Sequence, residues 1–117
     1  MEPQLETIIK AADAKRAENI SVLNISEISI IADYFIIMSA ETKRQVQAIA
    51  NEIIDNLKEK NYQLDNVEGL SEARWVVIVA GDFVVHIFDQ ESYDFYQLYR
   101  LWEQAKQVDV SSLITEN

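Results

Sequence analysis

The sequence predicts a single-domain α/β (α+β) fold with a mixed sheet of about five strands flanked by helices. Three observations lead to this class. Stretches with helical periodicity alternate with short β-branched runs along the chain. The segment WVVIVAGDFVVHIFD at 75–89 reads as a hairpin that is apolar on both faces, so both faces of the sheet should be covered. The length of 117 residues allows one hydrophobic core and therefore one domain.

The first part of the chain should contain one helix and two strands. Pro3 lies near the first helical position, and the helix is expected to end near Asn19. Its apolar stripe consists of Leu5, Ile8, Ile9 and Ala12. The run ISVLNI at 20–25 predicts a first strand, and the apolar run at 34–38 predicts a second strand that is buried on both faces.

The clearest helix of the chain follows these strands. Thr42 is a candidate N-cap, with Gln45 three residues later. The helix should end around Lys60, because its apolar stripe keeps helical spacing up to that region. The stripe consists of Val46, Ile49, Ala50, Ile53, Ile54 and Leu57. A polar strand at 63–68 and a loop around Gly69 are expected between this helix and the hairpin.

The turn of the hairpin determines which side chains share a face. Gly81 and Asp82 form a two-residue primed turn in which Gly81 takes a positive φ. If Ala80 pairs with Phe83, one face carries Trp75 opposite Phe88, Val77 opposite His86 and Val79 opposite Val84. The other face carries Val76, Ile78, Ala80, Phe83, Val85 and Ile87.

The last helix has more aromatic side chains than one core-facing stripe can use. That stripe is expected to consist of Phe95, Leu98, Leu101, Trp102 and Ala105. Tyr93, Tyr96 and Tyr99 recur every third residue on another face, so a second layer or another molecule should cover them. A self-complementary stripe predicts a homodimer when the protein is free. The segment after this helix, 107–117, has little periodicity and is expected to be a loosely held C-terminal tail on a domain of residues 1–106.

Composition and charge restrict the classes of function. No apolar run approaches the roughly 20 residues needed to cross a bilayer, and the start of the chain lacks a targeting pattern, so we expect a cytoplasmic protein without membrane contact. The formal net charge is −10, and the basic residues are scattered singly or in pairs. We therefore expect little direct nucleic-acid contact and a basic protein as partner. The alternative is that the charge serves solubility alone.

The sequence offers little for catalysis or cofactor binding. The two glycines, Gly69 and Gly81, do not make a phosphate-binding loop, and the absence of cysteine excludes thiolate chemistry. His86 is the only histidine, so a histidine metal cage is excluded, and we interpret it as a satisfied structural or surface residue beside Trp75 and Phe88. We predict no catalytic, cofactor-binding or metal-binding residues.

Several short motifs, taken in their order and spacing, resemble the ribosomal silencing factor family, also called Iojap-related proteins. The motifs are DYF at 33–35, RQVQAIA at 44–50, EG at 68–69, WVV at 75–77, GDFVVHIF at 81–88 and FYQL at 95–98 with LW at 101–102. The resemblance covers about residues 5 to 105. The sequence departs from the family at Val79-Ala80, where Asp-Tyr is usual, and at Ala40, Tyr93 and Tyr99, where Gly, Arg and Glu are usual.

The resemblance implies a nucleotidyltransferase-like fold without the catalytic motifs. It also implies binding to the large ribosomal subunit at ribosomal protein number fourteen, on the intersubunit face. Such binding keeps the small subunit from joining and represses translation when nutrients are short. Two alternatives are a nucleotidyltransferase-like enzyme and a purely structural dimer module.

The hairpin face and the last helix supply the expected contact residues, because large rings with a polar tip are typical interface anchors. The predicted partner-binding residues are Trp75, Val77, Asp82, His86, Phe88 and Tyr96. The predicted dimer residues are Tyr93, Tyr96 and Tyr99. Replacement of Tyr96 or His86 by alanine is expected to weaken binding and leave the melting temperature nearly unchanged.

Overall fold

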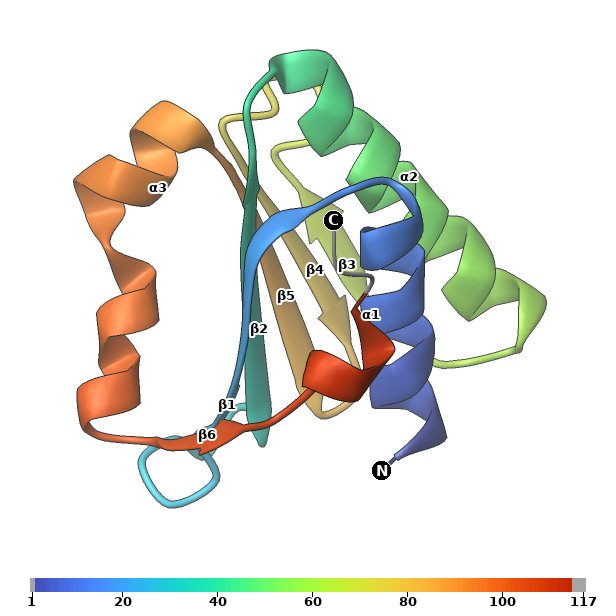
Figure 1. Ribbon diagram of the computed structural model, residues 1–117. Helices are drawn as coiled ribbons and strands as arrows, with labels where there is room; N and C mark the ends of the chain where they lie inside the picture. Colours follow the sequence, from blue (N-terminus) through green and yellow to red (C-terminus); the bar gives the residue numbers. More distant parts are fainter. Residues whose placement is uncertain (1, 115–117) are drawn as a thin grey trace.

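The computed structural model describes residues 2–114 and confirms a single α+β domain with a mixed sheet. Helices α1 (Pro3–Ala14) and α2 (Lys43–Glu59) cover one face of the sheet. Helix α3 (Gln90–Tyr96) and the 3-10 helix η1 (Leu98–Glu103) lie on the other side of the sheet (Figure 1). The strands are β1 (Glu18–Asn24), β2 (Tyr34–Ala40), β3 (Asn66–Glu68), β4 (Trp75–Ala80), β5 (Phe83–Asp89) and β6 (Lys106–Val108). A short 3-10 helix, η2 (Ser111–Leu113), follows β6.

The sheet order is β3-β4-β5-β2-β1-β6, which gives six strands where about five were expected. The pair β2–β5 is parallel and the other pairs are antiparallel. The additional strand is β6, in which Val108 pairs with Val22 of β1. Val110 is then buried, at 5% exposure. Residues 107 and 108, where the loosely held tail was expected to begin, thus pair with β1, because backbone pairing needs no periodic side-chain pattern. Residues 115–117 of the predicted tail lie outside the described part.

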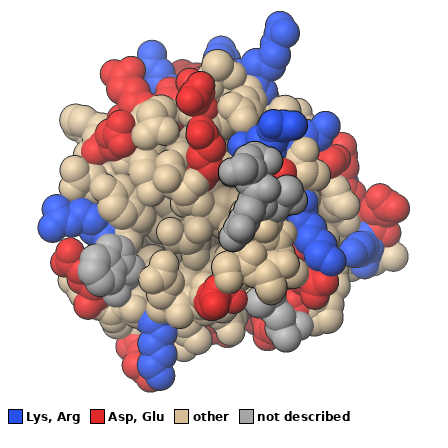
Figure 2. Space-filling view, in the orientation of Figure 1, with Lys and Arg blue, Asp and Glu red and all other residues tan. Residues whose placement is uncertain are grey.

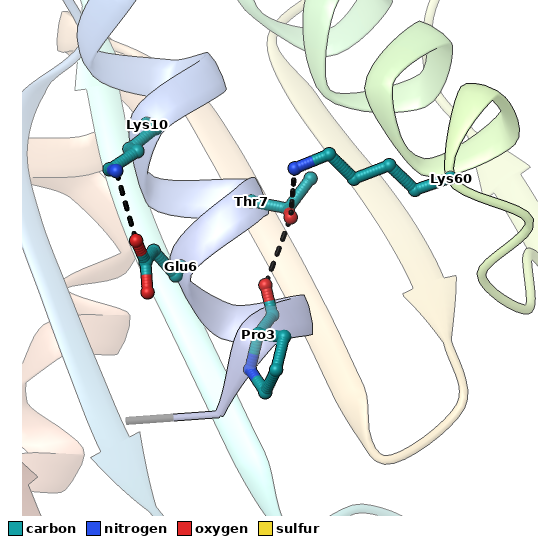
Figure 3. A network of polar contacts seen from close by, with 5 residues as sticks. All are labelled: Pro3, Glu6, Thr7, Lys10 and Lys60. Atoms are coloured by element: carbon teal, nitrogen blue, oxygen red, sulfur yellow. Dashed lines mark hydrogen bonds and ion pairs between the residues drawn. The ribbon is translucent and has the colours of Figure 1, made fainter.

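Helices α1 and α2 pack against each other and against the helix-facing side of the sheet. The Thr42 hydroxyl accepts from the Gln45 backbone N–H at 3.1 Å, which confirms the predicted cap. Between the helices, Lys60 Nζ donates to Thr7 Oγ1 at 3.2 Å, and Thr7 donates to the Pro3 carbonyl at 2.9 Å (Figure 3). These contacts tie the first turns of α1 to the end of α2.

Helix α1 ends at Ala14, five residues before the predicted end near Asn19. Arg16 takes a positive φ of 62°, and the Ala17 N–H bonds to the Ala12 carbonyl at 3.0 Å, which closes the helix. Strand β1 therefore begins at Glu18, with a register shift between Glu18 and Ser21.

The hairpin forms in the predicted register. Ala80 pairs with Phe83, Val77 with His86 and Trp75 with Phe88, and Gly81 has the expected positive φ of 60°. The strand predicted at 63–68 is shorter and spans Asn66–Glu68.

The loop that leads into β4 turns at Gly69, where φ is 83°. A Cβ atom built at this position would lie 2.3 Å from the Trp75 carbonyl oxygen, so this close approach requires glycine. The Gln47 side chain of α2 donates to the Leu70 carbonyl at 3.0 Å and holds the same loop. The path of the chain into Trp75 is thus fixed from two sides.

The second face of the sheet has its own smaller core, made of Leu23, Ile25, Ala32, Ile37, Val84 and Phe88. The segment 93–105 covers it with half-buried side chains, among them Tyr93, Leu98, Tyr99 and Leu101. The predicted continuous last helix is wrong, because Gln97 takes a left-handed conformation with φ of 53° and separates α3 from η1. Phe95, expected in the core, is 77% exposed. The side chain of Trp102, also expected there, lies outside the described residues.

Candidate partner-binding site

An exposed group of rings lies over the start of β4 and the end of β5, and we call Trp75, Phe95 and Tyr96 the aromatic patch. The ring centroids of Trp75 and Tyr96 are 4.8 Å apart, and those of Phe95 and Tyr96 are 5.0 Å apart. Tyr96 is 52% exposed, and Trp75 is half-buried. The patch therefore offers both a phenol and apolar ring surface to solvent.

Local chain geometry brings these rings together. The Asp89 carboxylate accepts from the Ser92 N–H at 2.8 Å, so α3 begins directly where β5 ends. The Asp89 N–H bonds to the Arg74 carbonyl at 3.0 Å, which holds the end of β5 against the start of β4. Seven helical residues then carry Tyr96 onto the indole of Trp75.

Two predicted partner-binding residues support the patch from beneath. Phe88 is fully buried, with its ring 4.9 Å from that of Trp75. His86 is 6% exposed and lies edge-on to Phe35, at 4.6 Å between ring centroids. Both residues belong to the core of this face and are not part of its exposed surface.

The hydrogen bonds of His86 determine where its proton lies. The Trp75 indole N–H donates to His86 Nδ1 at 3.0 Å, so this nitrogen carries no proton and the neutral ring holds its proton on Nε2. Burial lowers the pKa of His86 to about 4, so the ring is neutral at pH 7. Within the described part of the chain, buried Nε2 has no hydrogen-bond partner. Such an unsatisfied group costs about 1–3 kcal/mol, so the interpretation as a satisfied histidine holds for one nitrogen only.

Val77 and Asp82 take different positions relative to the patch. Val77 is half-buried and pairs with His86, so it lies on the same face of the sheet. Asp82 lies in the turn at the opposite end of the hairpin, where its carbonyl accepts from the backbone N–H groups of Asp33 and Tyr34, both at 3.0 Å. Asp82, predicted as a partner-binding residue, therefore lies away from Trp75 and Tyr96, because the two ends of a strand lie at opposite ends of the sheet.

The three tyrosines predicted for a dimer do not form one stripe. The rings of Tyr93 and Tyr99 stack at 4.8 Å with an angle of 19°, and both are half-buried against the second core. Burial raises the pKa of the Tyr93 hydroxyl. The left-handed residue Gln97 turns η1 so that Tyr99 faces inward, and Tyr96 alone of the three is exposed.

Sequence reasoning missed Phe95 as a residue of this surface. Its spacing from Leu98 suits a core-facing helical stripe equally well, and the reversal at Gln97 has no sequence signal such as glycine. The reversal at Gln97 accounts for the burial of Tyr99, whereas Phe95 precedes it and is exposed because α3 turns Tyr93 toward the second core instead.

The remaining surface is mixed in charge. In Figure 2 uncharged side chains occupy the middle of the face, and charged side chains lie around them. Among residues 2–114, no group of three or more His, Asp or Glu residues is placed to hold a metal ion. In the same part of the chain, no helix is both long enough and apolar enough to span a membrane.

The fold and the site together define a small α+β domain whose distinctive surface is an exposed aromatic patch with a buried aromatic support. The whole sequence, residues 1–117, matches the family model described as ribosomal silencing factor during starvation. The chain belongs to this family, which confirms the resemblance seen in its motifs.

Relatives from three bacteria are consistent with this assignment. Ribosomal silencing factor RsfS of Bacillus subtilis is 43% identical over 106 residues, which is 91% of this chain and 90% of the relative. A crystal structure of a Bacillus halodurans protein is 37% identical with a TM-score of 0.80, covering 91% of this chain and 96% of the other. A crystal structure of a Chromobacterium violaceum protein is 30% identical with a TM-score of 0.82, covering 88% of both chains.

Proposed function

We propose that this protein is a cytoplasmic ribosomal silencing factor that acts by binding and not by catalysis. It binds the large ribosomal subunit at ribosomal protein number fourteen and sterically blocks joining of the small subunit, which represses translation under nutrient limitation. The aromatic patch is the observation that carries the proposal. Family membership supports it, since the Bacillus subtilis relative is named as a ribosomal silencing factor.

The chemistry of the patch suits a protein partner. Tyr96 combines a large ring with a polar tip, Trp75 adds the surface of its indole ring, and Phe95 adds exposed apolar area at 77% exposure. Aromatic residues of this kind supply most of the binding energy in many interfaces. The net charge of −10 favours a basic partner such as a ribosomal protein, because opposite charges speed encounter and fix orientation.

The dimensions of the domain suit steric blocking. The chain measures 34 × 34 × 30 Å along its principal axes. Surfaces that form an interface approach to about 4 Å between heavy atoms. A folded body of this thickness on the joining face of one subunit therefore prevents contact with the other subunit, and no conformational change is needed.

The exposed patch also supports a homodimer of the free protein. Phe95 and Tyr96 are large exposed rings on one short helix, and a patch of this kind needs a cover when the partner is absent. A two-fold contact closes after one copy is added. Because the same rings serve both contacts, dimer and ribosome compete for this surface, and high protein concentration weakens the apparent affinity for the subunit.

Sedimentation with purified subunits tests the proposal. We expect the protein to pellet with large subunits and not with small ones, with binding that weakens as salt rises. It should also reduce formation of whole ribosomes when the subunits are mixed, as followed by light scattering. Equal binding to naked ribosomal RNA, or binding without any effect on joining, would contradict the proposal.

A pair of variants places the contact on the molecule. Tyr96→Ala should weaken binding to the large subunit by roughly tenfold or more and leave the melting temperature nearly unchanged, because the side chain is 52% exposed. Ile31→Ala is the control, since it removes an 85% exposed apolar side chain in the loop between β1 and β2. Equal loss of affinity in both variants would show that the patch is not the specific contact.

A further inference from the structure

His86 has a polar ring in surroundings that do not require one. Its ring contacts Phe35 at 4.6 Å, Trp75 at 6.0 Å and Phe88 at 6.4 Å between centroids. Its Nε2 is buried and has no partner among residues 2–114. An aliphatic side chain would fill this apolar position without leaving a buried donor unpaired. The polar contact that distinguishes the histidine is the hydrogen bond that its Nδ1 accepts from the Trp75 indole N–H.

This hydrogen bond holds Trp75, which is the one member of the aromatic patch that lies on a strand of the sheet. The ring centroid of Trp75 lies 4.9 Å from that of Phe88 and 4.8 Å from that of Tyr96, and the ring planes are tilted relative to each other. Apolar contacts of this kind hold a ring against its neighbours but depend weakly on its rotation. A hydrogen bond is directional, so the 3.0 Å bond from Trp75 Nε1 to His86 Nδ1 sets the rotation of the indole.

We propose that His86 is a positioning residue, whose Nδ1 fixes the indole of Trp75 in the orientation that the partner binds. This inference rests on the proposed function and assigns a role that the family membership does not specify. A side chain held in its bound orientation loses less conformational freedom on binding, so the bond contributes to affinity although His86 is buried. Because the indole N–H is already occupied, Trp75 meets the partner through its ring alone.

Two substitutions separate positioning from stability. His86→Leu removes the acceptor and also removes the unpaired Nε2–H. Because it also leaves the Trp75 indole N–H without its acceptor, the two effects offset one another. We expect the melting temperature to stay nearly unchanged and binding to large subunits to be roughly tenfold weaker. His86→Asn is smaller and should lower the melting temperature, but its side-chain oxygen lies near the place of Nδ1 and can accept from Trp75. It should retain most of the affinity, so the first variant loses binding and the second loses stability.

A measurement on Trp75 itself completes the test. In a Trp102→Phe background Trp75 is the only tryptophan, so its indole N–H gives one signal in a proton–nitrogen correlation spectrum. We expect exchange of this proton with solvent to be about tenfold faster in His86→Leu than in the parent and nearly unchanged in His86→Asn. This readout needs no ribosome.

The outcomes distinguish this inference from the proposed function. If the parent fails to bind large subunits, the proposed function is wrong, and the indole exchange rates still show whether His86 orients Trp75. Unchanged exchange in His86→Leu overturns the inference. Affinity of His86→Leu within twofold of the parent also overturns it, as does parallel loss of stability and affinity in both variants.

Discussion

Replacement of Gly69 by alanine should destabilise the fold more than the same replacement at Gly81. Both glycines have positive φ, 83° and 60°, and an L-residue in such a conformation costs about 1–2 kcal/mol. At Gly81 a new Cβ would meet nothing closer than Gln63 Oε1 at 3.8 Å, which is ordinary contact. The expected loss at Gly81 is therefore the conformational cost alone, about 1–2 kcal/mol.

At Gly69 a second term applies. The new Cβ would lie 2.3 Å from the carbonyl oxygen of Trp75 and 3.3 Å from its carbonyl carbon, both of which are backbone atoms. The backbone of β4 or of the loop has to shift, and relief of such overpacking costs about 1–3 kcal/mol. Added to the conformational cost, this gives an expected loss of about 2–5 kcal/mol.

Urea unfolding followed by circular dichroism measures both variants. The slope against urea should stay the same, so that the shift in midpoint reports the free energy of unfolding. Gly69→Ala should also weaken binding to large subunits, because the clash displaces the backbone that carries the indole. A loss at Gly69 equal to or smaller than the loss at Gly81 would refute the clash argument.

Three further predictions follow from the caps, the buried imidazole and the tyrosines. Thr42→Ala should lower the free energy of unfolding by about 1 kcal/mol in urea unfolding, and Thr42→Ser should restore most of it, because the hydroxyl accepts from the Gln45 N–H. The free energy of unfolding should fall as pH decreases from 6.5 toward about 4, because the unfolded chain binds a proton at His86 that the buried ring does not. His86→Leu should remove up to about 3 kcal/mol of this pH dependence; equal slopes in parent and variant would contradict it. Tyr99→Ala should lower the free energy of unfolding by about 2 kcal/mol and leave the dimer intact in light scattering. Tyr96→Ala should leave the free energy of unfolding nearly unchanged and disrupt the dimer.

The sequence predicts the parts of this fold that depend on local spacing. The hairpin register follows from the turn at Gly81 and from alternation along the two strands, and it is correct at every pair. The cap at Thr42 and the stripe of α2 follow from the same kind of local signal. Trp75, His86 and Phe88 therefore share a face in the structure as they do in the sequence prediction.

The errors arise where long-range contacts override or replace local signals. The 3-10 helix η1 has three residues per turn, so Leu98 and Leu101 share its sheet-facing side, as they would in an α-helix. The spacing of the apolar residues therefore gives no indication of the reversal at Gln97. Strand β6 has three residues and forms through pairing with β1. The burial of His86 depends on rings from neighbouring strands, among them Phe35 of β2 and Trp75 of β4, and its tautomer depends on the hydrogen bond that it accepts from Trp75.

The order of strands in the sheet has a consequence for synthesis of the chain. Strand β5 lies between β4 and β2, although it leaves the ribosome after both of them. Until β5 emerges, β2 has an open edge, and the short β3–β4 hairpin has no sheet to join. The apolar faces of β2 and of the β3–β4 hairpin therefore stay exposed to solvent until residue 89, the last of β5, has left the ribosome. A chain that ends in the turn at Gly81 should consequently aggregate or be degraded, while a chain that ends after β5 can close its central sheet.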